Sequence, residues 1–221
     1  MSSPNGLFLT LEGTEGAGKS TNVFRVCQTL DHARIPYIRT REPGGTEMAE
    51  EIRECMLRSR QESVAGLTEL LLVFAARTQH LETVIKPALA EGKWVVCDRF
   101  TDATFAYQGF GRNLNLAQIT TLEGWVQGDL QPDLTLFLDV DPVLSMERIR
   151  GRQLDRMEQE EMDFFIRVRN GYLRRAKQFP RFKIVDASRS IEAVQQDVQS
   201  IVELRVTHWL KAQKSPSQDT E

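Results

Sequence analysis

The feature that most constrains the fold is a glycine-rich segment near the N-terminus. Residues 13–20 read GTEGAGKS, which fits the pattern G-x-x-x-x-G-K-[ST]. The segment follows a short apolar run, Leu7–Leu11, and precedes a helical pattern over Ser20–Asp31. A strand that enters a helix through such a loop directs backbone N–H groups at a phosphate, and the positive end of the helix favours the same anion. The context therefore predicts a phosphate-binding loop at the start of an α/β domain.

Short apolar runs alternate with longer helical patterns along the rest of the chain. The further runs are Tyr37–Thr40, Trp94–Cys97, Leu134–Leu138 and Phe182–Val185. The helical patterns are Gly66–Glu91, with a kink or a new start at Pro87, and Leu116–Val126, Pro142–Arg150, Glu158–Gln178 and Ile191–Leu210. Such alternation is typical of a parallel sheet with right-handed crossovers. We predict one domain over 1–211, a three-layer α/β/α fold of the P-loop NTPase type with about five parallel strands, and a disordered polar tail over 212–221.

Most residues of the loop have a clear chemical role. Lys19 would place a positive charge on the outer phosphates of a nucleotide, and the Ser20 hydroxyl would bind Mg²⁺. Glu15 is the exception, because a carboxylate repels a phosphate unless it points away from it. It either accepts a hydrogen bond from a hydroxyl of a second substrate or complements the positive end of the helix. The residues expected to bind the nucleotide are Gly13, Thr14, Glu15, Gly16, Ala17, Gly18, Lys19, Ser20 and Thr21.

Charged residues stand at the ends of two further predicted strands. Arg41 lies in the segment TREPGGT at 40–46, and Asp98 and Arg99 follow the third apolar run. The carboxyl ends of parallel strands meet at one edge of a sheet, where ligands bind in α/β folds. Asp98 would hold Mg²⁺ through water and Arg99 a phosphate; an ion pair between these two neighbours is the alternative. For 40–46 the alternative to an anion-binding loop is a plain turn before a helix.

Three other groups are candidates for binding. Phe74 and Arg77 share one face of a predicted helix and would hold a base, unless Phe74 is a core aromatic. Tyr107 and Gln108 add an aromatic ring and an amide. Four arginines at 148, 150, 152 and 156 precede an acidic run, and they predict either a solvated helix face or a mobile lid over about 148–160. Arginine suits a lid because it stabilises charge spread over phosphoryl oxygens.

Composition argues against several classes of protein. The net charge is −3 and no extended basic face is visible, which disfavours a nucleic-acid-binding protein. No apolar run approaches the roughly 20 residues of a membrane span, and residues 1–6 lack the basic start of a secretory signal. The three cysteines lie far apart, a spacing that suits neither a disulfide framework nor a zinc site. We therefore expect a reduced, cytoplasmic protein with no membrane or nucleic-acid partner.

The motifs together resemble those of bacterial thymidylate kinases. The matching segments are GTEGAGKST at 13–21, TREPGGT at 40–46, FAAR at 74–77, ETVIKPAL at 82–89, DRF at 98–100, AYQG at 106–109, PDLTLFLDV at 132–140 and LDRMEQE at 154–160. With the arginine-rich stretch they follow the order of the family along about two-thirds of the chain. The phosphate-binding loop is shared with many families, whereas TREPGGT, FAAR, DRF and YQG together are specific.

The resemblance implies roles for residues at a second-substrate site. Phe74 would stack on thymine, Arg77 would bond the base, and Thr104 would also face it. Tyr107 resembles the aromatic residue that favours deoxyribose, and Glu15 resembles the carboxylate associated with the sugar 3′-hydroxyl. Arg41 and Arg99 match arginines near the dTMP phosphate. The residues expected to bind this substrate are Glu15, Arg41, Pro43, Phe74, Arg77, Arg99, Thr104, Tyr107 and Gln108.

Two further comparisons with the family concern the lid and the base. Arg152 aligns with a lid arginine that reaches the ATP phosphates, and Arg148 is a second lid residue expected to bind ATP. Some members carry an arginine in the loop, where this chain has Gly16, so the chain resembles the branch that relies on lid arginines. Ala103 stands where a hydroxyl residue is often found, which leaves that base contact to Thr104.

The resemblance implies the reaction ATP + dTMP → ADP + dTDP, with Mg²⁺, as a step of dTTP biosynthesis. A phosphate acceptor with a second pKa of about 6 needs no strong general base. The residues expected to act in the transfer are Lys19, Arg99, Arg152, Asp98 and Glu15.

Two other functions also fit the loop. One is another nucleotide or deoxynucleoside kinase, and the other is a nucleotide-dependent switch or ATPase. The partners expected from the resemblance are ATP, dTMP and a second copy of the chain, through helices within 66–91 and 116–126.

Overall fold

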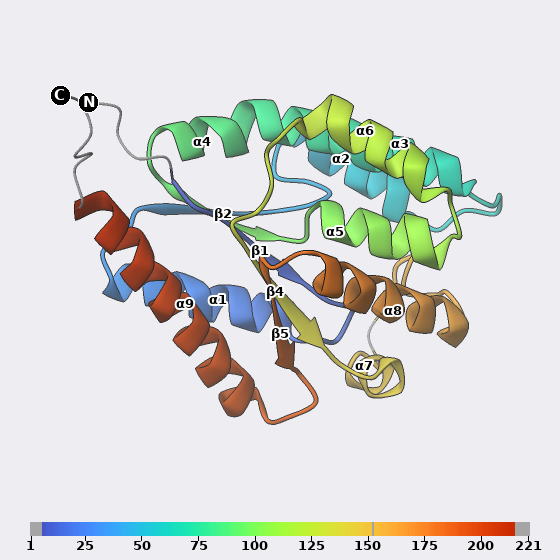
Figure 1. The fold of residues 1–221 in the computed structure, drawn as a ribbon. Helices are drawn as coiled ribbons and strands as arrows, with labels where there is room; N and C mark the ends of the chain where they lie inside the picture. The colour runs from blue at the N-terminus through green and yellow to red at the C-terminus, as the bar shows by residue number, and fades with distance from the viewer. Residues whose placement is uncertain (1–5, 152, 215–221) are drawn as a thin grey trace.

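The fold is organised around one parallel sheet. The computed structural model describes residues 6–151 and 153–214 (Figure 1). Within them the sheet has five parallel strands in the order β2-β3-β1-β4-β5. The strands are β1 (Phe8–Glu12), β2 (Tyr37–Arg41), β3 (Trp94–Asp98), β4 (Leu134–Asp139) and β5 (Phe182–Asp186). The fold prediction is confirmed, and every strand also includes the polar or charged residue that follows its apolar run.

Helices cover both faces of this sheet. Figure 1 shows α1 and α9 on one side and α3, α4, α6 and α8 on the other. The helical segments are α1 (Lys19–His32), α2 (Glu47–Leu57), α3 (Gly66–His80), η1 (Leu81–Ile85), α4 (Lys86–Ala90), α5 (Thr101–Thr104), η2 (Phe105–Gly111), α6 (Leu116–Gln127), α7 (Pro142–Arg148), α8 (Met162–Gln178) and α9 (Ile191–Lys214). Segments η1 and η2 are π-helical.

Strand β1 shows how the two faces are filled. Leu9 and Leu11 pack in the core that contains α1 and α9. Phe8 packs on the other side, in a cluster with Leu81. Successive side chains of a strand point to opposite faces, so Glu12, four residues after Phe8, lies on the side of Phe8. Because both faces are covered, this polar side chain is fully buried.

The helix boundaries agree with the prediction at Pro87 and differ from it elsewhere. Helix α4 begins at Lys86, directly after the π-helical η1, and Pro87 lies in its first turn, so a new helix starts there as predicted. The π-helical turn η1 changes the backbone hydrogen-bond pattern just before Pro87, which has no N–H to donate. Helix α7 ends at Arg148 rather than at 150, and α8 begins at Met162 rather than at 158 because residues 156–159 form turns.

Other helical segments escaped the periodicity analysis. No helix was assigned to α2 or to the α5–η2 segment. Thr46 caps α2 by accepting a hydrogen bond from the N–H of Ala49 at 3.1 Å, a local signal that would have located this helix. Helix α9 runs three residues past the predicted domain end at 211, and residues 215–221 of the predicted tail lie outside the described residues. In the described part of the chain, no helix combines the length and apolarity of a membrane span.

Candidate active site

The phosphate-binding loop joins β1 to α1. Gly16 and Gly18 adopt positive φ angles of 73° and 85°, which fold the loop back over the start of the helix. The Lys19 ammonium donates hydrogen bonds to the carbonyls of Gly13 at 3.0 Å and Thr14 at 2.9 Å, so the side chain lies across the loop. Burial and the nearby Arg99 lower the pKa of Lys19 to about 8, although acidic neighbours oppose this shift.

Helix α7 closely approaches this loop. A Cβ atom on Gly16 would lie 2.3 Å from the carbonyl oxygen of Ser145, so no side chain fits there without displacing α7. Thr14 and Ser145 also share a hydrogen bond of 3.2 Å between their hydroxyls. Arg148, at the end of α7, donates to the carbonyl of Ala187 at 2.9 Å and lines the cavity beside the loop. The structure thus explains why this position holds glycine rather than arginine.

A cavity of about 490 Å³ runs along the loop. It is lined mainly by polar and charged residues, namely Glu15, Gly16, Gly18, Lys19, Ser20, Thr21, Arg41, Glu42, Arg53, Asp98, Arg99, Arg148, Ile149, Asp155 and Glu158. The predicted nucleotide-binding residues Gly16, Gly18, Lys19, Ser20 and Thr21 are therefore brought together with both strand-end residues Arg41 and Asp98. Arg152 lies outside the described residues.

The oxygen atoms of Ser20 and Asp98 suit a magnesium ion. Asp98 Oδ1 is buried and has no hydrogen-bond partner within the protein. In residues 6–151 and 153–214, no group of three or more His, Cys, Asp or Glu side chains is arranged to hold a metal. Mg²⁺ is usually held by one or two protein oxygens together with phosphates and water. The residues present therefore fit Mg²⁺ that arrives with a nucleotide.

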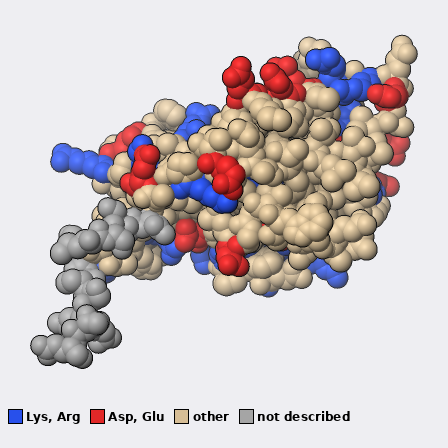
Figure 2. Space-filling model, turned by 90° about the horizontal axis from the view of Figure 1, so that it is seen from above, with Lys and Arg blue, Asp and Glu red and all other residues tan. Residues whose placement is uncertain are grey.

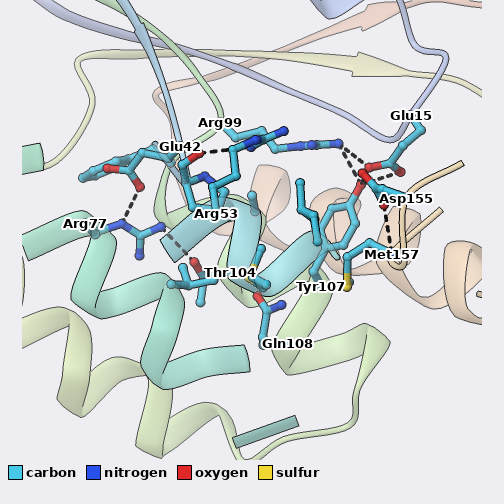
Figure 3. Close-up of a pocket in the computed structure, with 16 residues that line it drawn as sticks. Glu15, Glu42, Arg53, Arg77, Arg99, Thr104, Tyr107, Gln108, Asp155 and Met157 are labelled. Atoms are coloured by element: carbon cyan, nitrogen blue, oxygen red, sulfur yellow. Dashed lines mark hydrogen bonds and ion pairs between the residues drawn. The ribbon is translucent and has the colours of Figure 1, made fainter. Parts of the chain in front are cut away.

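A second, more apolar cavity adjoins the first (Figure 3). Its lining includes the predicted residues Glu15, Pro43, Arg77, Arg99, Thr104, Tyr107 and Gln108, and also Glu42, Arg53, Met56, Leu57, Val73, Phe100, Ala103, Asp155 and Met157. The two cavities share Glu15, Glu42, Arg53, Arg99 and Asp155. They therefore meet at a junction that carries two arginines.

Arg99, Glu15 and Tyr107 form a hydrogen-bonded group at this junction. Arg99 Nη2 donates to Glu15 Oε1 at 2.6 Å and to the Tyr107 hydroxyl oxygen at 3.0 Å, and that hydroxyl donates to the Glu15 carboxylate (Figure 3). Burial acts to raise the pKa of Glu15, but Arg99, Lys19 and Tyr107 outweigh it and lower the pKa below its ordinary value. Arg99 thus pairs with Glu15, rather than with its neighbour Asp98 as in the alternative interpretation.

Arg77 lines the apolar cavity and has one NH₂ group without a partner in the protein. Its Nε donates to Glu42 at 2.7 Å and its Nη2 donates to Thr104 at 2.9 Å, while the buried Nη1 has no partner within the protein. His80 lies 3.1 Å from the other oxygen of Glu42. Figure 3 shows Arg77 held between Glu42 and Thr104. A ligand with a hydrogen-bond acceptor would complete this arrangement.

Comparison with known proteins agrees with this geometry. Residues 11–198 match the sequence model of the family described as Thymidylate kinase. The chain belongs to the thymidylate kinase family. It is 54% identical over 200 residues to the thymidylate kinase of Teredinibacter turnerae, covering 90% of this chain and 98% of that protein. It is 55% identical over 208 residues to the thymidylate kinase of Chromohalobacter salexigens, covering 92% and 98%.

Phe74 is buried on the core side of α3. Its ring packs in a core cluster with Leu70, Phe105 and Ile119, and it does not line the apolar cavity. Val73 lines the cavity together with Arg77. Residues four apart on a helix are separated by only about 40° around its axis, whereas residues three apart, such as Phe74 and Arg77, are separated by about 60°. This packing favours the core-aromatic alternative for Phe74, and stacking on a base stays a prediction.

The role of Phe74 can be tested with two neighbouring residues. We expect Phe74→Leu to lower the free energy of unfolding by about 1 kcal/mol while KM for dTMP stays within about twofold. Val73→Asp, on the cavity side, should raise KM for dTMP by about tenfold or more, because it puts an unpaired charge beside the bound base. Chemical denaturation and steady-state kinetics measure the two effects. A larger rise in KM for Phe74→Leu than for Val73→Asp would support the stacking role.

Sequence reasoning missed Arg53, which lines both cavities. It projects from α2, the helix that was not assigned, and its Nη1 donates to the carbonyl of Pro43 at 3.0 Å. Burial and the nearby Arg41 and Arg99 lower the pKa of Arg53, which indicates mutual repulsion among cations. Arg41, in contrast, forms an ion pair with Glu50 at 2.7 Å and is about half exposed. It lines the larger cavity but not the apolar one.

Glu12 is a second residue that the sequence analysis did not single out. Burial, with a contribution from Asp102, raises its pKa to about 8, although bonds from Tyr172 and Phe100 oppose the shift. The folded protein therefore keeps a proton that the unfolded chain releases near pH 4.5. Between these two values the free energy of unfolding falls as pH rises, because the native state binds more protons than the unfolded state.

The Glu12→Gln variant should remove this pH dependence. Between pH 5 and 8 its stability relative to wild type is expected to rise by up to about 1.4 kcal/mol per pH unit. Urea denaturation at several pH values measures the difference. Parallel stability curves for the two proteins over this range would show that Glu12 is ionised in the folded state.

Proposed function

We propose that this protein transfers the terminal phosphoryl group of ATP to dTMP, giving ADP and dTDP. The observation that carries the proposal is the junction of the two cavities at Arg53, Arg99 and Glu15. One cavity has the phosphate-binding loop, and the other has apolar walls with a few polar groups, as a site for a base requires. Such a junction brings the phosphates of two nucleotides together.

ATP binds with its phosphates over the loop. Lys19 and the N–H groups at the start of α1 neutralise their charge. The adenine occupies a further cavity beside the loop, lined by Gly16, Ala17, Gly18, Thr21, Asn22, Arg148, Ala187, Arg189, Ser190, Ile191 and Val194. Arg148 lines both this cavity and the phosphate cavity, which suits a lid residue that contacts ATP. We also propose that Arg152 contacts the ATP phosphates and that residues 148–160 form a mobile lid.

The acceptor dTMP lies in the apolar cavity. Its base accepts a hydrogen bond from the free Nη1 of Arg77, its 3′-hydroxyl donates to the ionised Glu15, and its phosphate meets Arg53 and Arg99. Tyr107 stands against the sugar, where it disfavours a 2′-hydroxyl. The second hypothesis for Glu15, a helix-dipole role, is less suited to a side chain that pairs with Arg99 and lines this cavity.

Ser20 and Asp98 would hold Mg²⁺ together with the ATP phosphates, Asp98 through water. The ion, when bound, neutralises charge that develops on the phosphoryl oxygens. Catalysis by the protein then consists of alignment and charge neutralisation, because the acceptor phosphate is already a nucleophile near neutral pH. Lys19 and Arg99 stand on either side of the transferred group, and closure of the lid excludes water that would hydrolyse ATP.

A coupled assay of ADP formation across acceptors tests this function. We expect dTMP to be used in preference to dUMP, dCMP, dGMP and thymidine. Preference for another acceptor would favour a different nucleotide or deoxynucleoside kinase. Equal phosphate release from ATP with and without any acceptor would instead indicate a switch or ATPase.

We further propose that the protein acts in the cytoplasm as a homodimer. Leu67 and Leu71 of α3 and Leu116 and Trp125 of α6 are exposed apolar side chains. Figure 2 looks onto this side of the molecule and shows a broad area of uncharged side chains with charged ones around it. A second copy seated on α3 and α6 would cover that area. Sedimentation of wild type and Leu71→Glu at equal concentration tests the proposal; a monomeric wild type would overturn it.

A further inference from the structure

The backbone at Arg99 is held in an uncommon conformation. Arg99 follows the last residue of β3 and has a φ angle of 70°, a region that residues other than glycine rarely adopt. Its N–H donates to the carbonyl of Leu11 at 2.9 Å. This turn directs the Arg99 guanidinium toward Glu15, at the junction of the two cavities (Figure 3). The conformation costs free energy and needs support from surrounding groups.

Glu12 supplies that support from the neighbouring strand. One carboxyl oxygen of Glu12 accepts a hydrogen bond from the N–H of Phe100 at 2.8 Å, and the other accepts from the Tyr172 hydroxyl at 2.9 Å. The side chains of all three residues are buried, and Glu12 directly precedes the first glycine of the loop. One carboxyl group therefore joins the strand that leads into the loop, the turn that carries Arg99, and α8.

A second path leads from Glu12 to the same site through aromatic rings. The Tyr172 ring stacks on Phe137 and meets the edge of the Tyr107 ring at 6.4 Å between centroids. Tyr107 in turn bonds Glu15 and lies 5.1 Å from the Arg99 guanidinium carbon. Fixing the Tyr172 hydroxyl thus also limits movement of the ring that supports Tyr107.

We infer that Glu12 is a positioning residue for the acceptor side of the site, which it serves by holding the Arg99 turn and the Tyr172 ring without touching either substrate. The inference rests on the proposed function, because it assigns Arg99 and Tyr107 to the acceptor. The lining of the nucleotide cavities does not include Glu12, and Lys19 is fixed by carbonyls of the loop itself. A disturbance at Glu12 should therefore reach the acceptor side first.

The chemistry of the two hydrogen bonds decides which substitutions are informative. Glutamine has the same length, and its carbonyl oxygen accepts from the Phe100 N–H while its NH₂ donates to the Tyr172 oxygen. Alanine removes both hydrogen bonds and leaves the Phe100 N–H buried without an acceptor. Glu12 contributes hydrogen-bond geometry rather than charge. We therefore expect the glutamine variant to keep the kinetic constants that the alanine variant loses.

The experiment compares Glu12→Ala, Glu12→Gln and a matched control. For Glu12→Ala we expect KM for dTMP to rise about tenfold and kcat to fall about tenfold or more, with ATP affinity within about twofold of wild type. Glu12→Gln should keep both constants within about threefold. Thr135→Val removes a buried hydrogen bond of 3.0 Å to Thr10 in the same sheet, so it controls for loss of stability alone.

Three results would overturn the inference. They are equal loss of ATP and dTMP affinity in Glu12→Ala, a loss in Glu12→Gln as large as in the alanine variant, and a kinetic change in Thr135→Val equal to that of Glu12→Ala.

If Glu12→Ala does not fold, Tyr172→Phe provides a second test, because it removes one hydrogen bond only. It should raise KM for dTMP by about threefold with ATP affinity unchanged. Equal effects on both substrates would overturn the inference. Absence of dTDP formation by wild type would contradict the proposed function instead.

Discussion

Replacement of Lys19 by methionine is expected to lower kcat for dTDP formation by about two to three orders of magnitude. Methionine has a similar length but no charge, so it removes the ammonium group that faces the outer phosphates of ATP. The Lys19 side chain lies across the loop between the Gly13 and Thr14 carbonyls, and no other lysine lines the phosphate cavity in the described part of the chain. Steady-state kinetics with saturating dTMP measure this loss.

The control for this variant is Lys93→Met. Lys93 is partly exposed and pairs with Glu91 far from the loop in the sequence, so its replacement should leave kcat unchanged. If Lys19→Met kept more than about a tenth of the wild-type kcat, the phosphates would not lie where the loop predicts.

The Arg99→Met variant should lose both activity and stability. Arg99 is the group that pairs with Glu15 and stands at the acceptor phosphate, so we expect kcat/KM for dTMP to fall about a thousandfold. The variant also leaves Glu15 buried without its ion-pair partner, which is expected to lower the free energy of unfolding by up to about 3–5 kcal/mol, while the Tyr107 hydroxyl still donates to it. Kinetics and urea denaturation measure the two effects.

A double variant separates these effects. Adding Glu15→Gln to Arg99→Met removes the unpaired charge, so stability should return close to the wild-type value while activity stays low. Recovery of activity together with stability would show that Arg99 serves only the fold. A stable Arg99→Met single variant would show that Glu15 takes a proton or another partner when Arg99 is absent.

Local patterns in the sequence located much of the site. The loop at 13–20 was recognisable because its glycines, Lys19 and Ser20 are adjacent in the chain. Arg41 and Asp98 were placed at one sheet edge because each ends an apolar run, and parallel strands bring such ends together. These inferences needed only spacing and the rule for strand ends.

Other residues could not be placed in this way. Arg53 lies on a helix with few buried apolar residues, Ala49 and Met56, so its hydrophobic periodicity is weak. Phe74 was assigned to the base because it is aromatic and close to Arg77, whereas the direction of its side chain depends on the helices packed against α3. A rotation of one residue along a helix turns a side chain by about 100°.

The sequence by itself determined the five strands and most of the helices between them, the phosphate-binding loop, and the family to which the chain belongs, because each of these is specified by neighbouring residues. Only the tertiary structure decided that Arg99 pairs with Glu15 rather than with Asp98, that Val73 rather than Phe74 faces the cavity, and that Glu12 holds the Arg99 turn. These contacts join residues that are far apart in the chain or differ only in direction. Packing of the helices on the sheet sets such contacts, and no local pattern of residues specifies them.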